Sequence, residues 1–99
     1  MNHNEIVTKI IAASFQRANN EIPGFEATPS PELPMFDVPG AILDSLNLIT
    51  FVFILEDEIK KATGLKVKIT TEDVLNNSES PFRSVQGISD FLLRKVRND

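Results

Sequence analysis

Apolar and polar positions in the first twenty residues repeat with the period of an α-helix. Six apolar residues recur at helical spacing with polar residues between them, namely Ile6, Val7, Ile10, Ile11, Phe15 and Ala18. This spacing predicts a helix over residues 5–19 with one buried stripe. Asn4 stands where a capping side chain is needed, and Glu5 adds a negative charge to the first turn. We expect His3 to be a solvated terminal residue.

The strongest helical pattern of the chain occupies residues 45–63. Asp44 is placed to cap the start of this helix, and Gly64 is placed to end it. Seven apolar residues make up the face that we predict to be buried: Leu48, Ile49, Phe51, Val52, Leu55, Ile59 and Ala62. Polar side chains cover the opposite face, so the pattern predicts a helix packed on one side.

Three apolar residues of this segment do not fit the buried face. Leu46 and Phe53 fall at its margin, and Ile54 falls on the polar side. Apolar surface that stays exposed often marks a contact site, but the preceding loop could instead cover it. Both interpretations remain open for this surface, which lies beside Ser45.

A long irregular segment joins these two helices. The prolines of residues 20–43, together with Gly24 and Gly40, exclude regular structure, and the connection is far longer than most. Six larger apolar residues are scattered through it: Phe25, Leu33, Met35, Phe36, Val38 and Ile42. A solvated linker carries less apolar surface than this, so we expect the second half to pack across the helices. The alternative is a flexible connector with exposed aromatic rings.

The last third of the chain predicts two more helices. Residues 65–69 alternate apolar and basic side chains like a strand, but they have no partner strand, so we predict an extended connector. Thr70 or Thr71 can cap a short helix over residues 71–76, and residues 77–81 form a loop. Ser84 opens a helix over residues 84–97, whose buried stripe is Val85, Ile88, Phe91, Leu92 and Val96.

Together these segments predict an all-α fold. We expect a small four-helix bundle of three main helices and one short helix, with a long first loop. The 99 residues, of which 41 % are hydrophobic, are enough for a single domain over residues 1–99 with a modest core. No apolar run is long enough for a membrane span, and the first residues do not resemble a secretion signal. We therefore expect a cytoplasmic monomer.

Charge narrows the kinds of partner that the protein can have. The formal net charge is −4, which argues against nucleic acid as a partner. No Lys or Arg occurs between Arg17 and Lys60, and eight acidic residues lie in that interval: Glu21, Glu26, Glu32, Asp37, Asp44, Glu56, Asp57 and Glu58. The start of the second helix is therefore expected to lie in a negative field, which favours basic partners.

The residue inventory does not favour catalysis. A serine nucleophile needs an imidazole beside it, and the only histidine is His3 near the N-terminus. The adjacent residues Glu56, Asp57 and Glu58 are expected to fan outwards into solvent, so they do not make a catalytic pair. With no cysteine, no metal cluster and no glycine-rich phosphate loop in the sequence, we expect a protein that is not an enzyme.

Ser45 is the residue with the clearest candidate chemistry. It opens the second predicted helix, where unpaired N–H groups and the helix dipole favour a bound anion. A phosphoester on the Ser45 hydroxyl would therefore be stabilised. Neither this serine nor Asp44 requires a function, because a first-turn serine and an N-cap aspartate are also ordinary features of a helix start.

The run Asp44-Ser45-Leu46 at the start of the second helix, within this order of elements, resembles the acyl and peptidyl carrier protein family over most of the chain. The resemblance implies that Ser45 carries 4′-phosphopantetheine, taken from coenzyme A, whose thiol holds a cargo as a thioester. It implies that Asp44 helps a phosphopantetheinyl transferase to engage its substrate with magnesium. Other implied partners are a ligase that loads an acyl or aminoacyl group and the transferases or synthases that use it.

Departures from the family pattern indicate a specialised member. Carriers of general fatty acid biosynthesis usually have acids at the positions of Asn47 and Thr50, whereas Glu56, Asp57 and Glu58 match the family's lower acidic cluster. The form Leu43-Asp44-Ser45 is more similar to D-alanyl carriers and other dedicated carriers. We expect partners to bind through apolar packing with a peripheral acidic rim, at Leu46, Asn47, Thr50, Phe53, Ile54 and Asp57. The alternative is an unmodified four-helix interaction module.

Overall fold

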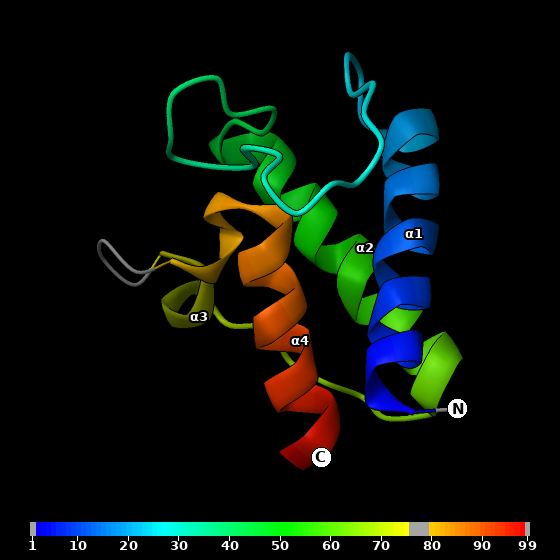
Figure 1. Ribbon diagram of the computed structural model, residues 1–99. Helices are drawn as coiled ribbons and strands as arrows, with labels where there is room; N and C mark the ends of the chain where they lie inside the picture. The colour runs from blue at the N-terminus through cyan, green and yellow to red at the C-terminus, as the bar shows by residue number, and fades with distance from the viewer. Residues whose placement is uncertain (1, 76–79, 99) are drawn as a thin grey trace.

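The computed structural model describes residues 2–75 and 80–98, which are mostly helical and contain no strand. The elements, in chain order, are α1 (His3–Glu21), α2 (Ser45–Thr63), α3 (Thr71–Leu75), the 3₁₀ turn η2 (Pro81–Arg83) and α4 (Val85–Asn98). Helix α1 packs against both α2 and α4, and the short α3 lies to one side near η2 (Figure 1). The predicted all-α bundle of three long helices and one short helix is confirmed.

Capping side chains fix most helix boundaries. In α2, Asp44 Oδ1 accepts a hydrogen bond from the Asn47 N–H at 2.8 Å, and Gly64 ends the helix in the left-handed region with φ 77°. Both boundaries agree with the prediction. The predicted start of α1 is wrong, because Asn2 instead of Asn4 is the cap and accepts from the Glu5 N–H at 2.8 Å. Two asparagines stand close together here, and capping by the earlier one makes the helix begin two residues sooner.

The last two helices also start at polar caps. Thr70 Oγ1 accepts from the Asp73 N–H at 3.1 Å and Asp73 Oδ2 accepts from the Thr70 N–H at 2.9 Å, a reciprocal capping box. Ser84 precedes α4 and accepts from the Gly87 N–H at 3.1 Å, so it caps that helix. The predicted end of the third helix at residue 76 and most of the predicted loop over 77–81 lie outside the described residues.

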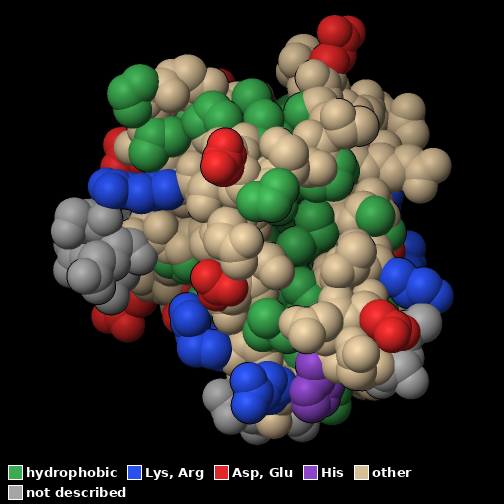
Figure 2. Space-filling model, in the orientation of Figure 1, with side chains coloured by type: hydrophobic (Ala, Val, Ile, Leu, Met, Phe, Trp, Pro, Cys, Tyr) green, Lys and Arg blue, Asp and Glu red, His purple; other side chains and the backbone are tan. Residues whose placement is uncertain are grey.

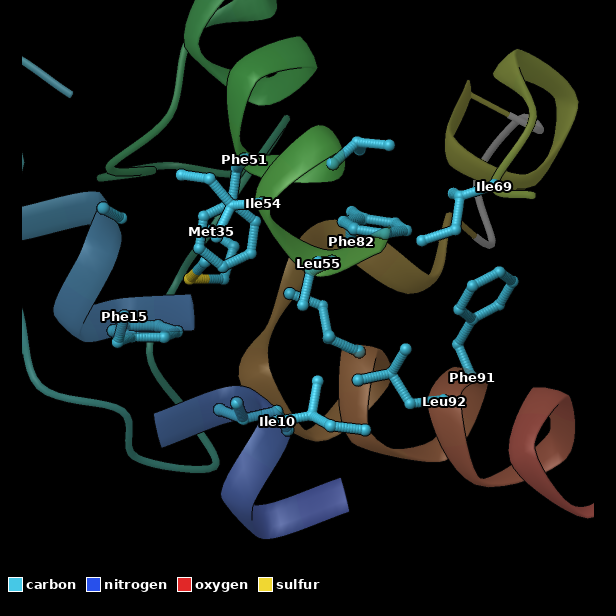
Figure 3. Packing of buried hydrophobic residues seen from close by; sticks show 14 of the residues in the cluster. Ile10, Phe15, Met35, Phe51, Ile54, Leu55, Ile69, Phe82, Phe91 and Leu92 are labelled. Carbon is cyan, nitrogen blue, oxygen red and sulfur yellow. The ribbon is translucent and has the colours of Figure 1, made fainter. Parts of the chain in front are cut away.

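The core lies between α1, α2, α4 and the segments that cover them. The predicted stripes of α1 and α4 face it, except that Ile6 is only half-buried (Figure 3). Three rings form one cluster, in which the centroid of Phe15 lies 5.5 Å from that of Phe25 and 5.7 Å from that of Phe51. Phe25 belongs to the long loop, so this cluster ties the loop to both helices.

The second half of the long loop packs across the helices, as predicted, and the flexible alternative is wrong. Met35 is fully buried and Leu43 is nearly so, whereas Phe36 and Val38 are half-buried. The Met35 N–H donates to the Arg83 carbonyl at 2.9 Å, and the Leu43 N–H donates to the Met35 carbonyl at 2.9 Å. The loop is thus bonded to η2 and then to itself immediately before α2, where it lies over the end of the bundle in Figure 1.

The segment between α2 and α3 is an extended connector without strand pairing, as predicted. Val67 and Ile69 point into the core, while Lys66 and Lys68 are exposed. The Ile69 N–H donates to Glu56 Oε2 at 2.8 Å, which fastens the connector to α2. The alternation of apolar and basic residues in this connector therefore reflects one side that is buried and one side that faces solvent.

Surface views agree with this arrangement. Figure 2 shows hydrophobic side chains on this face gathered over the long loop and between α1 and α4, with charged side chains mostly around the edges. His3, the only histidine, lies at the surface at the N-terminal end of α1, as expected of a solvated terminal residue.

Gly87→Ala is expected to destabilise the protein by about 1–3 kcal/mol, as overpacking of a tight contact does. A Cβ atom at Gly87 would collide with the carbonyl oxygen of Pro81. The sign of the change in the free energy of unfolding is informative, because Gly→Ala at an open helical site stabilises a protein by about 0.5–1 kcal/mol. Urea unfolding measures the difference, with Arg94→Ala at an exposed position of α4 as the control. A stabilised Gly87→Ala protein would show that η2 does not press on α4.

Candidate functional site

Ser45 is an exposed residue at a fixed place. It is the first residue of α2, one position after the capping Asp44 and two after the buried Leu43. Leu43 is buried in the core, and its N–H donates a hydrogen bond to the Met35 carbonyl, so the chain is held in place where it enters α2. The first N–H groups of any helix have no acceptor within it, so the surroundings of the Ser45 hydroxyl favour an anion.

An apolar pocket of about 540 Å³ opens beside Ser45. One wall is α2, and the opposite wall is the extended connector with the start of α3. The residues that line this Ser45 pocket are Phe36, Ser45, Leu48, Ile49, Val52, Phe53, Lys68, Ile69, Thr70 and Val74. Ser45, Thr70 and the exposed Lys68 are its polar members, so the interior suits an apolar ligand and the rim can meet a polar or charged one.

One side of α2 remains apolar and exposed. Leu46, Ile49 and Phe53 are 75 %, 54 % and 63 % exposed, and they recur at intervals of three and four residues. The exposure of Leu46 and Phe53 agrees with the first of the two interpretations, in which apolar surface stays exposed beside Ser45. The long loop does not cover these two side chains, which settles that alternative. Thr50 is exposed on the same side, and Asn47 is half-buried.

The predicted faces of α2 are wrong at three residues. Ile54 is only 2 % exposed, so it is not available to a partner, while Ile49 and Ala62 are exposed instead of buried. The reason is the position of α1, which contacts α2 at Phe51 and Glu58. Ile54 lies three residues after the first and four before the second, so the same helix covers it (Figure 3).

The acidic residues in the middle of α2 are held within the protein. Arg17 of α1 donates to Asp57 at 2.6 Å and to Glu58 at 2.9 Å, and Glu58 is buried. Lys61 lies 3.4 Å from a carboxylate oxygen of each. Glu56 accepts from the connector backbone. The expectation that these three acids fan into solvent is therefore wrong for Glu56 and Glu58, because α1 and the connector approach both sides of the helix.

These contacts shift the pKa values of Arg17 and Asp57. The pKa of Arg17 is raised by the hydrogen bonds that its guanidinium donates, first to Glu21 and then to Glu58 and Asp57. The pKa of Asp57 is lowered, chiefly by the Arg17 guanidinium and next by Lys61. Both shifts stabilise the charged forms of Arg17 and Asp57, so these two residues form an ion pair that joins α1 to α2.

Acid should weaken the ion pair between Arg17 and Asp57, because it protonates the Asp57 carboxylate. A carboxyl whose pKa is lowered by folding contributes stability that is present above its unfolded pKa and lost as pH falls through the folded value. The free energy of unfolding should therefore fall below about pH 3.8, the ordinary value for Asp57, and Asp57→Asn should reduce that fall. Urea unfolding over a pH series measures both, with the exposed Glu32→Gln as the control. Equal slopes in wild type and Asp57→Asn would contradict the assignment.

The structure brings together part of the predicted partner surface. Leu46, Thr50 and Phe53 share the exposed side of α2 that begins at Ser45. Ile54 lies in the core, and Asp57 is turned towards Arg17. The Ser45 pocket itself was not predicted. Its signal in the sequence was the apolar alternation of the connector, which indicated a buried side without indicating that α2 was its neighbour.

Known proteins provide no further guide to this site. No protein-family model matches the chain, and no curated protein or solved structure shows significant similarity to it. Among residues 2–75 and 80–98, no helix is long and apolar enough to cross a membrane. Function is therefore inferred from the geometry and chemistry of α2 and its pocket.

Proposed function

We propose that the protein is a carrier of acyl or aminoacyl groups, held as thioesters on 4′-phosphopantetheine attached to Ser45. The observation that supports this most directly is the position of Ser45, an exposed hydroxyl at a helix start that adjoins an apolar pocket of about 540 Å³. The resemblance of Asp44-Ser45-Leu46 to the carrier family gives the group its chemical identity. The partners proposed are a phosphopantetheinyl transferase, a loading ligase and the enzymes of a specialised pathway.

The residues around Ser45 fit such a group. Its phosphate would lie at the start of α2, where free N–H groups and the helix dipole favour negative charge. The arm supplies a thiol, which this cysteine-free chain does not have. The apolar lining of the Ser45 pocket, including Leu48 and Val52, can shelter a hydrocarbon cargo from water.

The chain's own residues position the hydroxyl. Asp44 holds the first turn by capping Asn47, and Leu43 holds the approach by its burial. In the attachment step the Ser45 oxygen bonds to the phosphorus of coenzyme A that bears the pantetheine arm. The bond from that phosphorus to the 3′,5′-ADP portion breaks, and the hydroxyl proton is released. A transferase supplies the magnesium and the base, so the carrier needs only an accessible serine.

A second function has support from one observation. Leu46, Ile49 and Phe53 form an exposed apolar side of α2 that a protein can bind whether or not Ser45 is modified. An unmodified interaction module would use this surface alone. Modification of Ser45 distinguishes the two functions.

The test is loading by a transferase. The purified protein is incubated with coenzyme A, magnesium and a broad-specificity phosphopantetheinyl transferase, and its intact mass is measured. We expect an increase of one phosphopantetheine in wild type and in Ser30→Ala, the control at an exposed loop serine, and no increase in Ser45→Ala. Ser45→Ala should keep its stability within about 0.5 kcal/mol, because it is a surface change beside an intact cap.

Two results would count against the proposal. Wild type that stays unmodified with several transferases would remove the carrier function and leave the interaction module. A large loss of stability in Ser45→Ala would indicate that this serine has a structural role.

A further inference from the structure

Three lysines lie beside the exposed apolar side of α2. Lys60, Lys66 and Lys68 line a second pocket, of about 410 Å³, together with Phe53, Glu56, Asp57 and Val67. Phe53 and Lys68 also line the Ser45 pocket, so the two pockets are adjacent. The apolar residues and the lysines therefore belong to one continuous surface, which we call the lysine-apolar face: Leu46, Ile49, Phe53, Lys60, Lys66 and Lys68.

Three lysines and two carboxylates line this second pocket, so its positive side chains outnumber its negative ones. Asp57 is paired with Arg17 and Lys61, and Glu56 keeps its negative charge while it accepts from the Ile69 N–H. The three lysines are exposed, and none of them forms an ion pair with a carboxylate of the described residues. A chain with a net charge of −4 thus has a locally basic surface next to its most exposed apolar side chains.

The face has the dimensions of a helix-binding surface. Leu46, Ile49, Phe53 and Lys60 lie along one side of α2, over about 21 Å at 1.5 Å per residue. Apolar anchors that repeat with helical spacing fit an amphipathic helix laid alongside them. Positive charges at the side of such a surface select a partner that carries acidic residues in the matching place.

We propose that the lysine-apolar face binds an acidic amphipathic helix of a partner protein, whose apolar side packs on Leu46, Ile49 and Phe53 and whose carboxylates pair with the lysines. This differs from the acidic rim expected from the sequence, because Arg17 and the connector engage Glu56, Asp57 and Glu58, while Lys60, Lys66 and Lys68 are exposed. A protein is favoured over an anionic bilayer because two pockets interrupt the face, and side chains can fill pockets that a flat surface cannot. The inference shares its site with the proposed function but does not require Ser45 to be modified.

The test uses the full chain and two synthetic probes. One peptide is an amphipathic helix with Leu and Ile on one side and Glu at the flanks, and the other has Lys in place of every Glu. Affinities come from titration of the isotopically labelled protein, followed by amide chemical shifts. We expect the Glu peptide to bind at least about tenfold more tightly than the Lys peptide, with shifts over residues 46–68 and weakening by salt. The net charge alone would favour the Lys peptide.

Matched variants separate local from total charge. Lys60→Glu, Lys66→Glu and Lys68→Glu combined should lower affinity for the Glu peptide by about tenfold or more, since three attractive surface pairs are replaced by repulsive ones. A control with the same net charge reverses three other exposed residues, Lys9, Arg94 and Arg97, and should bind like wild type.

Three outcomes of the peptide titrations would overturn the proposal. They are a preference for the Lys peptide, no binding of either peptide, and equal losses in the two triple variants. Binding to vesicles that contain phosphatidylserine, without binding to the Glu peptide, would show that the face meets a membrane and would also overturn it. The mass increase at Ser45 is independent of all these results, so the failure of the carrier function is distinguishable from the failure of this one.

Discussion

Met35→Ala should lower the free energy of unfolding by about 2–5 kcal/mol, the cost of truncating a fully buried methionine. Met35 has no exposed surface, although it belongs to an irregular loop. Its backbone also joins the loop to η2 through Arg83 and to the start of α2 through Leu43. Loss of the side chain removes the apolar contact that holds these bonds in place.

The effect should extend to Ser45. Amide exchange of Leu43 is expected to accelerate in Met35→Ala, because its N–H donates to the Met35 carbonyl. Glu32→Ala, an exposed change in the same loop, is the control and should alter neither stability nor exchange. Equal stability of Met35→Ala and wild type in urea would mean that the loop does not hold α2 at its start.

Ile54→Ala should lower the free energy of unfolding several-fold more than Phe53→Ala, although the two residues are neighbours in the sequence. Ile54 is 2 % exposed under α1, so its truncation should cost about 2–5 kcal/mol. Phe53 is 63 % exposed, so its truncation should cost about 0.5 kcal/mol or less. The larger side chain is thus the less important one for stability, because burial determines the cost.

The two substitutions should have the reverse order of effects on binding of the Glu peptide, with Phe53→Ala the more harmful. Phe53→Ala removes an exposed anchor from the lysine-apolar face and should weaken partner binding, which titration with the Glu peptide measures. A stable Ile54→Ala protein together with an unstable Phe53→Ala protein would mean that α2 is rotated from the described position.

Local chemistry made much of the fold predictable. Asp44 and Gly64 mark the ends of α2 because a capping carboxylate and a left-handed glycine act within a single turn. The stripes of α1 and α4 were also predictable, since each of these helices buries one side. The start of α1 was missed because Asn2 and Asn4 can both cap a helix, and local sequence does not choose between them.

Contacts between distant segments were not predictable from one sequence. Ile54 was placed on the polar side of α2 because the spacing of apolar residues within α2 does not show where α1 packs against it. The pairing of Arg17 with Glu58 spans 41 residues, and the connector reaches α2 through Glu56. These contacts bury Glu58 and half-bury Glu56, and they bring Lys66 and Lys68 beside α2, which adds positive charge next to a helix expected to lie in a negative field.

The most direct test of the proposed carrier function is to locate the added group in the loaded protein. Because no Lys or Arg lies between Arg17 and Lys60, trypsin should release residues 18–60 as one peptide that contains Ser30 and Ser45. Fragmentation mass spectrometry of this peptide, after incubation with transferase and coenzyme A, should place one phosphopantetheine on Ser45 and none on Ser30. An unmodified peptide, or a group attached to any other residue, would contradict the proposal.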